Sequence, residues 1–172
     1  MQRGLVVNEG RAAMPHVHEN RERKIRTEML IRKPAAEVFE AFVDPEITAR
    51  FWFTKGSGRL EKGKRVRWDW EMFGVWDELL VEELVPGETI RVVWSDGSRT
   101  EWNFASRDGN STFVTIDAWG FPGDHDEFFA TALDQTGGYT IVLCSLKAWL
   151  EHGVQLHAVA DKAPDAIVDG ER

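Results

Sequence analysis

The chain has 172 residues, of which 42% are hydrophobic, and it carries a formal net charge of −8 at pH 7. This length is typical of one domain that folds without a disulfide or a metal, and the acidic balance argues against nucleic-acid binding, because phosphates attract cations. No apolar run reaches the roughly 20 residues that a membrane span needs, and the N-terminal residues contain no signal-peptide core, so we expect a cytoplasmic protein with no membrane partner.

A polar tail, a strand and a short helix are the first predicted elements. Residues 1–22 are polar and aperiodic, which predicts a loosely held N-terminal tail. His16 and His18 within it stand at a spacing that suits a metal pair, but no third ligand is near, and the tail interpretation is favoured. Alternation over 25–32 predicts a strand, and Pro34 then fits the start of an apolar helix.

A second short helix, predicted by Asp44 and Pro45, leads into a series of strands. Turns rich in glycine separate segments in which apolar and charged residues alternate. That alternation is typical of antiparallel strands with one face in water. The apolar positions are Val66, Trp68 and Trp70; Ile90, Val92 and Trp94; Trp102 and Phe104; and Thr112, Val114, Ile116 and Ala118.

A long helix is predicted from near Asp126 to a stop at Gly153. The pair Gly137-Gly138 predicts a kink, a split or the close approach of another backbone. Cys144, the single cysteine, excludes an internal disulfide and is expected to be buried in this helix. Residues 154–172 are interpreted as a C-terminal tail that wraps the surface. The order of elements predicts an α+β domain over 23–153, in which a curved sheet grips the closing helix.

Four segments together resemble one protein family. Their order and spacing are similar to the SRPBCC (START-like, Bet v 1-like) superfamily, and more specifically to the family named for the activator of Hsp90 ATPase. The resemblance covers about residues 24–153. The segments are Ile31-x-x-Pro34-Ala35-x-x-Val38-Phe39, Asp44-Pro45-Glu46 with Phe51-Trp52, Val81-x-Glu83-x-x-Pro86 with Ile90-x-x-x-Trp94, and Gly138-Tyr139 before Leu143, Leu146-Lys147 and Leu150-Glu151.

The resemblance implies a helix-grip fold, in which an antiparallel sheet of six or seven strands wraps round the C-terminal helix and two short helices close one end. It also implies a hydrophobic cavity between sheet and helix, which the superfamily uses for lipids, polyketides, hormones or other apolar molecules. The chain has eight tryptophans, and such large aromatics either fill a core, which is the favoured interpretation, or line a cavity.

If the aromatics line a cavity, we expect a definite set of ligand-binding residues from the strands and the closing helix. They are Trp68, Trp70, Trp76, Glu78, Trp102, Phe104, Trp119, Phe129, Leu133 and Tyr139.

The segment 75–84 has carboxylates on both of its alternating faces. If its whole length faced a pocket, a carboxylate would have to point inward, and Glu78 is the preferred one because Trp76 and Leu80 flank it on the same face. A buried carboxylate is costly, so it would be evidence of function. The favoured alternative is that the strand bends or bulges and the acids lie at its wet ends.

Three functions remain open from the sequence. The preferred one is binding of a small, largely apolar molecule by a monomer or homodimer, with no catalytic residues, metal or cofactor. The second is a cyclase or hydrolase that uses Glu78 and Tyr139 as acid–base groups. The third, implied by the family resemblance, is an interaction module with a chaperone as partner, which would need an exposed apolar patch.

Overall fold

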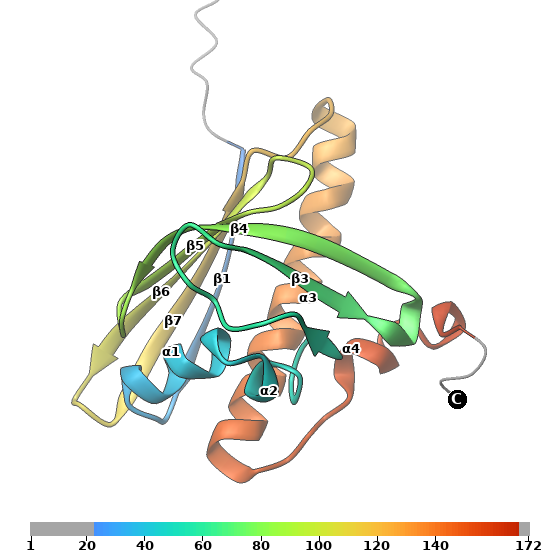
Figure 1. Cartoon of the computed structure of the whole chain (residues 1–172). Coiled ribbons are helices and arrows are strands. Elements are labelled where there is room, and N and C mark those ends of the chain that lie inside the picture. The colour runs from blue at the N-terminus through green and yellow to red at the C-terminus, as the bar shows by residue number, and fades with distance from the viewer. Residues whose placement is uncertain (1–22, 169–172) are drawn as a thin grey trace, which may run out of the picture.

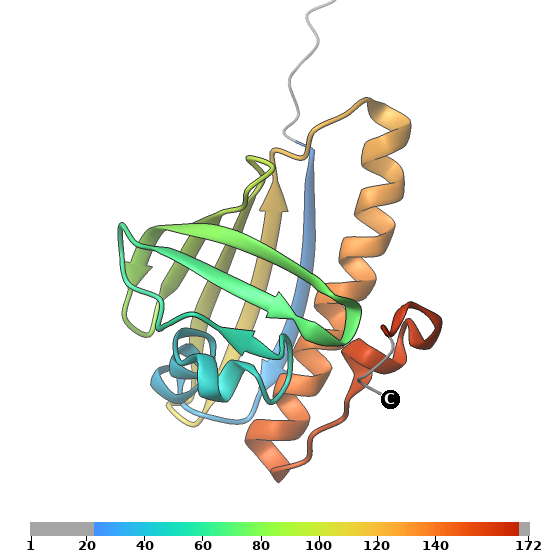
Figure 2. The ribbon, with the colours of Figure 1, turned by 45° about the vertical axis from the view of Figure 1, so that its right-hand side comes forward.

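The computed structural model describes residues 23–168, so the predicted tail with His16 and His18 lies outside the described residues. Seven antiparallel strands form one sheet in the order β1-β7-β6-β5-β4-β3-β2. The sheet is curved, and a long helix, α3, runs along it (Figures 1 and 2). The strands are β1 (Lys24–Ile31), β2 (Lys55–Gly56), β3 (Arg65–Trp70), β4 (Val75–Val85), β5 (Thr89–Val93), β6 (Arg99–Arg107) and β7 (Ser111–Trp119).

Two short helices, α1 (Ala35–Val43) and α2 (Pro45–Thr48), follow β1 and close one end of the curved sheet (Figure 1). The side chain of Asp44 accepts a hydrogen bond from the N–H of Glu46 and caps α2, as its sequence position predicts. A 3₁₀ turn, η1 (Glu71–Phe73), joins β3 to β4. After α3 (His125–His152) come α4 (Ala158–Asp161) and η2 (Pro164–Ala166). The predicted α+β helix-grip architecture is therefore confirmed.

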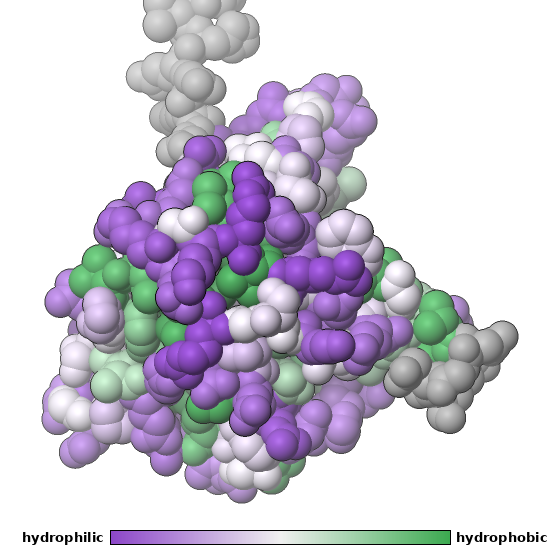
Figure 3. Space-filling model, viewed as in Figure 1, coloured by the Kyte–Doolittle hydropathy of each residue, from purple (hydrophilic) through white to green (hydrophobic). Residues whose placement is uncertain are grey.

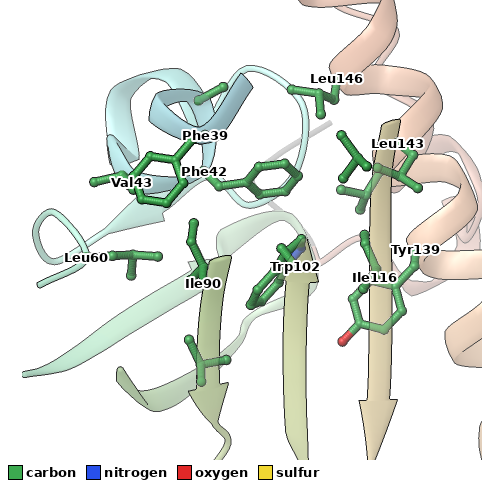
Figure 4. Packing of buried hydrophobic residues seen from close by; sticks show 14 of the residues in the cluster. Phe39, Phe42, Val43, Leu60, Ile90, Trp102, Ile116, Tyr139, Leu143 and Leu146 are labelled. Carbon is green, nitrogen blue, oxygen red and sulfur yellow. The ribbon is translucent and has the colours of Figure 1, made fainter. Parts of the chain in front are cut away.

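The alternation in the strands separates a dry concave face from a charged outer face. Residues such as Trp68, Val92 and Trp102 are buried under the helices. Their neighbours on the outer face form ion pairs across the strands, for example Arg65 with Glu78. The aromatic rings of the core meet edge to face or tilted, as for Phe42 and Trp102, whose centroids are 5.9 Å apart (Figure 4).

The C-terminal half of α3 is fixed to the sheet by apolar packing and by hydrogen bonds to Leu30 in the edge strand β1 and to Arg32 just after it. Leu143 and Leu146 are fully buried against the concave face (Figure 4). Lys147 Nζ donates to the carbonyl of Leu30 at 2.8 Å, and Glu151 Oε1 accepts from the backbone N–H of Arg32 at 2.7 Å. Because an edge strand has unpaired backbone groups, these bonds also protect β1 from pairing with another chain.

Two local predictions about this helix are wrong. Helix α3 is uninterrupted through Gly137 and Gly138, neither of which has a positive φ, so the pair does not split it. No backbone of another segment lies within 4 Å of the place where a Cβ on either glycine would be, so the pair does not serve a close backbone approach. Cys144 is exposed, because it lies on the side of the helix that faces away from the sheet. The start and the stop of the helix are as expected: Asp124 and Glu127 form a capping box, and Gly153 ends it with φ 66°.

The bond between Glu151 and β1 generates a stability prediction. Burial opposes ionisation of this carboxyl, but hydrogen bonds from Lys147 and from the Arg32 N–H hold its pKa below the ordinary value of 4.5. Its ionised form therefore stabilises the fold above about pH 4.5, and that contribution is lost as pH falls through the folded-state pKa. We expect Glu151→Gln to lower the free energy of unfolding at pH 7 by about 1–3 kcal/mol.

Urea unfolding at pH 7 and at pH 3 measures this difference, which should shrink at the lower pH because the contribution of the ionised carboxylate falls as pH falls below the ordinary value of 4.5. Glu61→Gln is the matched control, since the Glu61 side chain is 57% exposed beside Lys64. An equal loss in both variants, or a loss for Glu151→Gln that does not change with pH, would contradict the assigned role.

Candidate functional site

A cavity of about 450 Å³ lies between the concave face of the sheet and the N-terminal half of α3. Its walls come from β3, β4, the β5–β6 turn, α3 and the segment that follows α3. Six aromatic side chains contribute most of the apolar lining. They are Trp52, Trp70, Phe73, Trp94, Phe121 and Tyr139.

The cavity exists because the face of α3 that is turned to the sheet changes along the helix. From Tyr139 to Leu146 this face carries large buried side chains that fill the space. In the two turns before Tyr139 it carries Thr131, Gln135 and Gly138, which line the cavity. No heavy atom lies within 4 Å of the place where a Cβ on Gly138 would be. Small and polar residues on this stretch therefore leave the volume that the C-terminal half of the helix occupies.

A chain of hydrogen bonds fixes the polar groups at the inner end of the cavity. Trp94 Nε1 donates to Thr100 Oγ1 at 2.8 Å, and that oxygen is 2.8 Å from the hydroxyl of Tyr139. Burial raises the pKa of Tyr139 to about 12, and the negative charge of Asp96 acts in the same direction. The phenol is therefore protonated at neutral pH and serves as a hydrogen-bonding group.

Three carboxylates line the cavity, and one ammonium group accompanies them. Asp134 on α3 is paired with Lys162 Nζ at 3.0 Å. Asp77 is half-buried at the start of β4, and its Oδ1 accepts the N–H of Glu78. Asp96 lies in the exposed β5–β6 turn, where its Oδ1 accepts from the N–H and the hydroxyl of Ser98.

A side chamber of about 180 Å³ adjoins the cavity, and Trp52 and Val159 line both. The hydroxyl of Ser145 on α3 is buried at this chamber without a hydrogen-bond partner among residues 23–168. A buried hydroxyl without a partner costs free energy. The Ser145 hydroxyl is therefore a polar group of the side chamber that is available to a ligand.

The segment after α3 forms a wall of both spaces, which the prediction of a surface tail did not anticipate. Val159 lies between them, and Lys162 and Ala163 line the larger cavity. The segment is tied down by the Lys162–Asp134 ion pair and by the N–H of Val168, which donates to the carbonyl of Met72 at 3.0 Å. The cavity is thus closed by residues beyond the predicted end of the domain at 153.

The ten predicted ligand-binding residues fall into three groups. Trp70 and Tyr139 line the cavity. Trp68, Trp102 and Phe104 are 1%, 1% and 5% exposed and belong to the packed core. The remaining five lie away from the cavity. Trp76, Phe129 and Leu133 are largely exposed. Glu78 pairs with the exposed Arg65 on the outer face, and Trp119 lies there beneath the ammonium group of Lys24.

Strand β4 shows why Glu78 is not the inward acid. Asp77, Leu79 and Val81 face the concave side, so Glu78 lies on the outer face with Arg65. The register shifts between Val81 and Glu83, as the bulge alternative predicted, and Leu84 then pairs with Ile90. The carboxylate that faces the cavity is Asp77, and the cross-strand pairing of Asp77 with Trp68 is the signal that assigns its face.

Comparison with known proteins identifies the family. Residues 32–165 match the family described as Activator of Hsp90 ATPase homolog 1-like protein. The chain belongs to this family. No curated protein matched the chain.

Solved structures share the family's fold. Protein SSP2350 from Staphylococcus saprophyticus is 30% identical, with a TM-score of 0.69, covering 77% of this chain and 95% of its own. DynU16, from the dynemicin biosynthetic locus, is 21% identical, with a TM-score of 0.68, covering 78% of this chain and 49% of its own. Aha1 from Colwellia psychrerythraea, solved in solution as a dimer, is 18% identical, with a TM-score of 0.64, covering 76% of this chain and 97% of its own. Within residues 23–168, every helix is too short or too polar to cross a membrane.

The position of Tyr139 can be tested directly because it is the only tyrosine in the chain. Absorbance of tyrosinate during an alkaline titration should show a midpoint near pH 12 for the native protein, because burial favours the neutral phenol. The folded-state pKa is raised, so the contribution of this group to stability is full below about pH 10 and is lost as pH rises towards 12. The same titration in concentrated urea provides the reference near pH 10, and a native midpoint equal to it would show that the phenol is not buried.

Proposed function

We propose that this protein binds a small, largely apolar molecule in the cavity between the sheet and α3. The observation that carries the proposal is the cavity itself, about 450 Å³ with six aromatic side chains in its wall. Sites for small molecules are typically concave spaces of about 300–1,000 Å³ with apolar walls and a few placed polar groups. The hydroxyl of Tyr139, which is bonded to Thr100, and the carboxylate of Asp77 are such groups here.

The family and its structural relatives support the same proposal. The fold that the chain shares with its relatives surrounds a space between sheet and helix, and that space is open in this protein. One of the similar structures, DynU16, comes from the dynemicin biosynthetic locus, which is a setting in which proteins handle small molecules. This similarity supports a small-molecule ligand and leaves its identity to experiment.

The enzyme alternative loses the residues on which it was based. Glu78 is bound to Arg65 on the outer face, so it does not reach Tyr139. A phenol with a pKa of about 12 is a poor base at neutral pH, and its hydroxyl is already bonded to Thr100. The geometry therefore favours binding over acid–base catalysis by this pair.

The chaperone-partner alternative needs a broad exposed apolar surface. On the face shown in Figure 3, hydrophobic residues are interrupted by hydrophilic ones. Phe129 and Leu133, one turn apart on α3, are 61% and 63% exposed and form a narrow apolar strip. A pull-down that recovers Hsp90, with a change in its ATP turnover that Phe129→Ser abolishes, would favour this alternative.

Filling the cavity from Gly138 tests the binding proposal. Gly138→Leu places a side chain in open space within the wall of the cavity and replaces a poor helix former, so the protein should stay folded. We expect it to weaken binding of the neutral probe N-phenyl-1-naphthylamine by about tenfold or more, followed by probe fluorescence. An increase in probe fluorescence that is identical in wild type and Gly138→Leu would place the probe elsewhere.

Gly138→Ala is the matched control because it adds one methyl group and gains helix propensity. It should raise the free energy of unfolding by about 0.5–1 kcal/mol and keep most of the probe binding. Native mass spectrometry of the protein purified from its own source should in addition detect a small molecule that is released on denaturation. The same preparation of Gly138→Leu should carry less of it.

A further inference from the structure

The carboxylates of the sheet are paired with cations on the outer face but not on the concave face. Each outward-facing carboxylate of the described strands pairs with an arginine or lysine side chain. These carboxylates are Glu28, Asp69, Glu78, Glu82, Glu83, Glu101 and Asp117. Asp77, the strand carboxylate that faces the cavity, has no ion pair within residues 23–168. The outer face is thus close to neutral, whereas the cavity is not.

The wall of the cavity has an excess of negative charge. Three aspartates and one lysine line it, and Lys162 is already paired with Asp134, so Asp77 and Asp96 contribute two uncompensated charges. Asp77 Oδ1 accepts a hydrogen bond from Glu78 in the same strand, and Asp96 Oδ1 accepts from Ser98 in the same turn. In the part of the chain that the structure describes, Oδ2 of each has no hydrogen-bond donor and remains available to a ligand.

The aromatic part of the wall has the same preference for positive charge. The faces of Trp52, Trp70 and Trp94 are negative because of the ring quadrupole, and they attract cations within about 6 Å of the ring centre. The hydroxyl of Tyr139, which is bonded to Thr100, is neutral at physiological pH. Aromatic faces and free carboxylates therefore attract the same class of group, and both repel an anion.

A metal ion does not account for these carboxylates. Across residues 23–168, no group of three or more His, Cys, Asp and Glu side chains is arranged to hold one. The walls are instead broad and apolar, which suits an organic molecule.

We propose that the ligand of this cavity is an organic cation: an amine or quaternary ammonium group attached to an apolar, ring-sized body. The inference rests on the proposed binding function and adds the charge of the ligand. The apolar body lies among the tryptophans and α3, and the charged group lies on the side of Asp77 and Asp96. Such a ligand replaces water at two carboxylates while it buries its body against the aromatic wall.

Three naphthalene compounds of equal ring size and different charge test this inference. They are 1-naphthylmethylamine, which is an ammonium ion at pH 7, the neutral 1-naphthalenemethanol, and the anion 1-naphthoate. Isothermal titration calorimetry at low salt should give the order ammonium, alcohol, carboxylate, with the ammonium bound about threefold to tenfold more tightly than the alcohol. Added salt should reduce this difference, because salt screens exposed charges.

The double variant Asp77→Asn/Asp96→Asn should bring the ratio of ammonium affinity to alcohol affinity down to about one, because asparagine keeps the Oδ1 acceptors and removes only the charge. Glu78→Gln is the control, since it removes the neighbouring charge on β4 that faces outward. If the double variant does not fold, the variants Asp77→Asn and Asp96→Asn are compared separately, and each should reduce the preference for the ammonium compound in part.

Each result of this experiment decides one of two questions. Equal affinity of the wild type for ammonium and alcohol, or a preference that the double variant retains, overturns the inference and leaves the binding function in place. An equal loss in Glu78→Gln also overturns it, because the effect would then be one of net charge. Failure of all three compounds and of the neutral probe to bind would reject the binding function itself.

Discussion

The cavity exists because the two halves of α3 contact the sheet differently. Its C-terminal half is fixed by Leu143 and Leu146 in the core and by Lys147 and Glu151 at the backbone of β1. With one half fixed, a continuous helix of 28 residues carries its other half along the open side of the sheet. Where Thr131, Gln135 and Gly138 face the sheet, they do not fill the space beneath the helix, so a cavity remains. The helix must be continuous for this arrangement, which gives the uninterrupted passage through Gly137 and Gly138 a structural role.

Charge and aromaticity are distributed in a way that follows from the curvature of the sheet. The outer face carries paired charges in water, where such pairs cost little and add little to stability. The concave face carries Trp68 and Trp102, which complete the core, and Trp70 and Trp94, which border the cavity. The same residue type thus fills the core in one place and lines the cavity in another, and its depth under α1, α2 and the C-terminal half of α3 decides which.

Sequence reasoning reached the fold because alternation, turns and caps are local signals. It placed Val66, Trp68, Ile116 and Ala118 on the buried face, and the structure agrees. It failed where a long-range relation decides the outcome. The face of Glu78 depends on its register against β3, and the exposure of Phe129 and Leu133 depends on where α3 leaves the sheet. The wall made by Val159 and Lys162 carries no periodic pattern, so no local signal could have assigned it to the site.

The most direct test of the account is a ¹⁵N spectrum of the tryptophan indole N–H groups, eight in number, during addition of a neutral naphthalene probe. Binding in the cavity predicts that the signals of Trp52, Trp70 and Trp94 shift together with one affinity, while those of Trp76 and Trp119 on the outer side stay in place. Shifts confined to Trp76 or Trp119, with the three cavity signals unchanged, would contradict it.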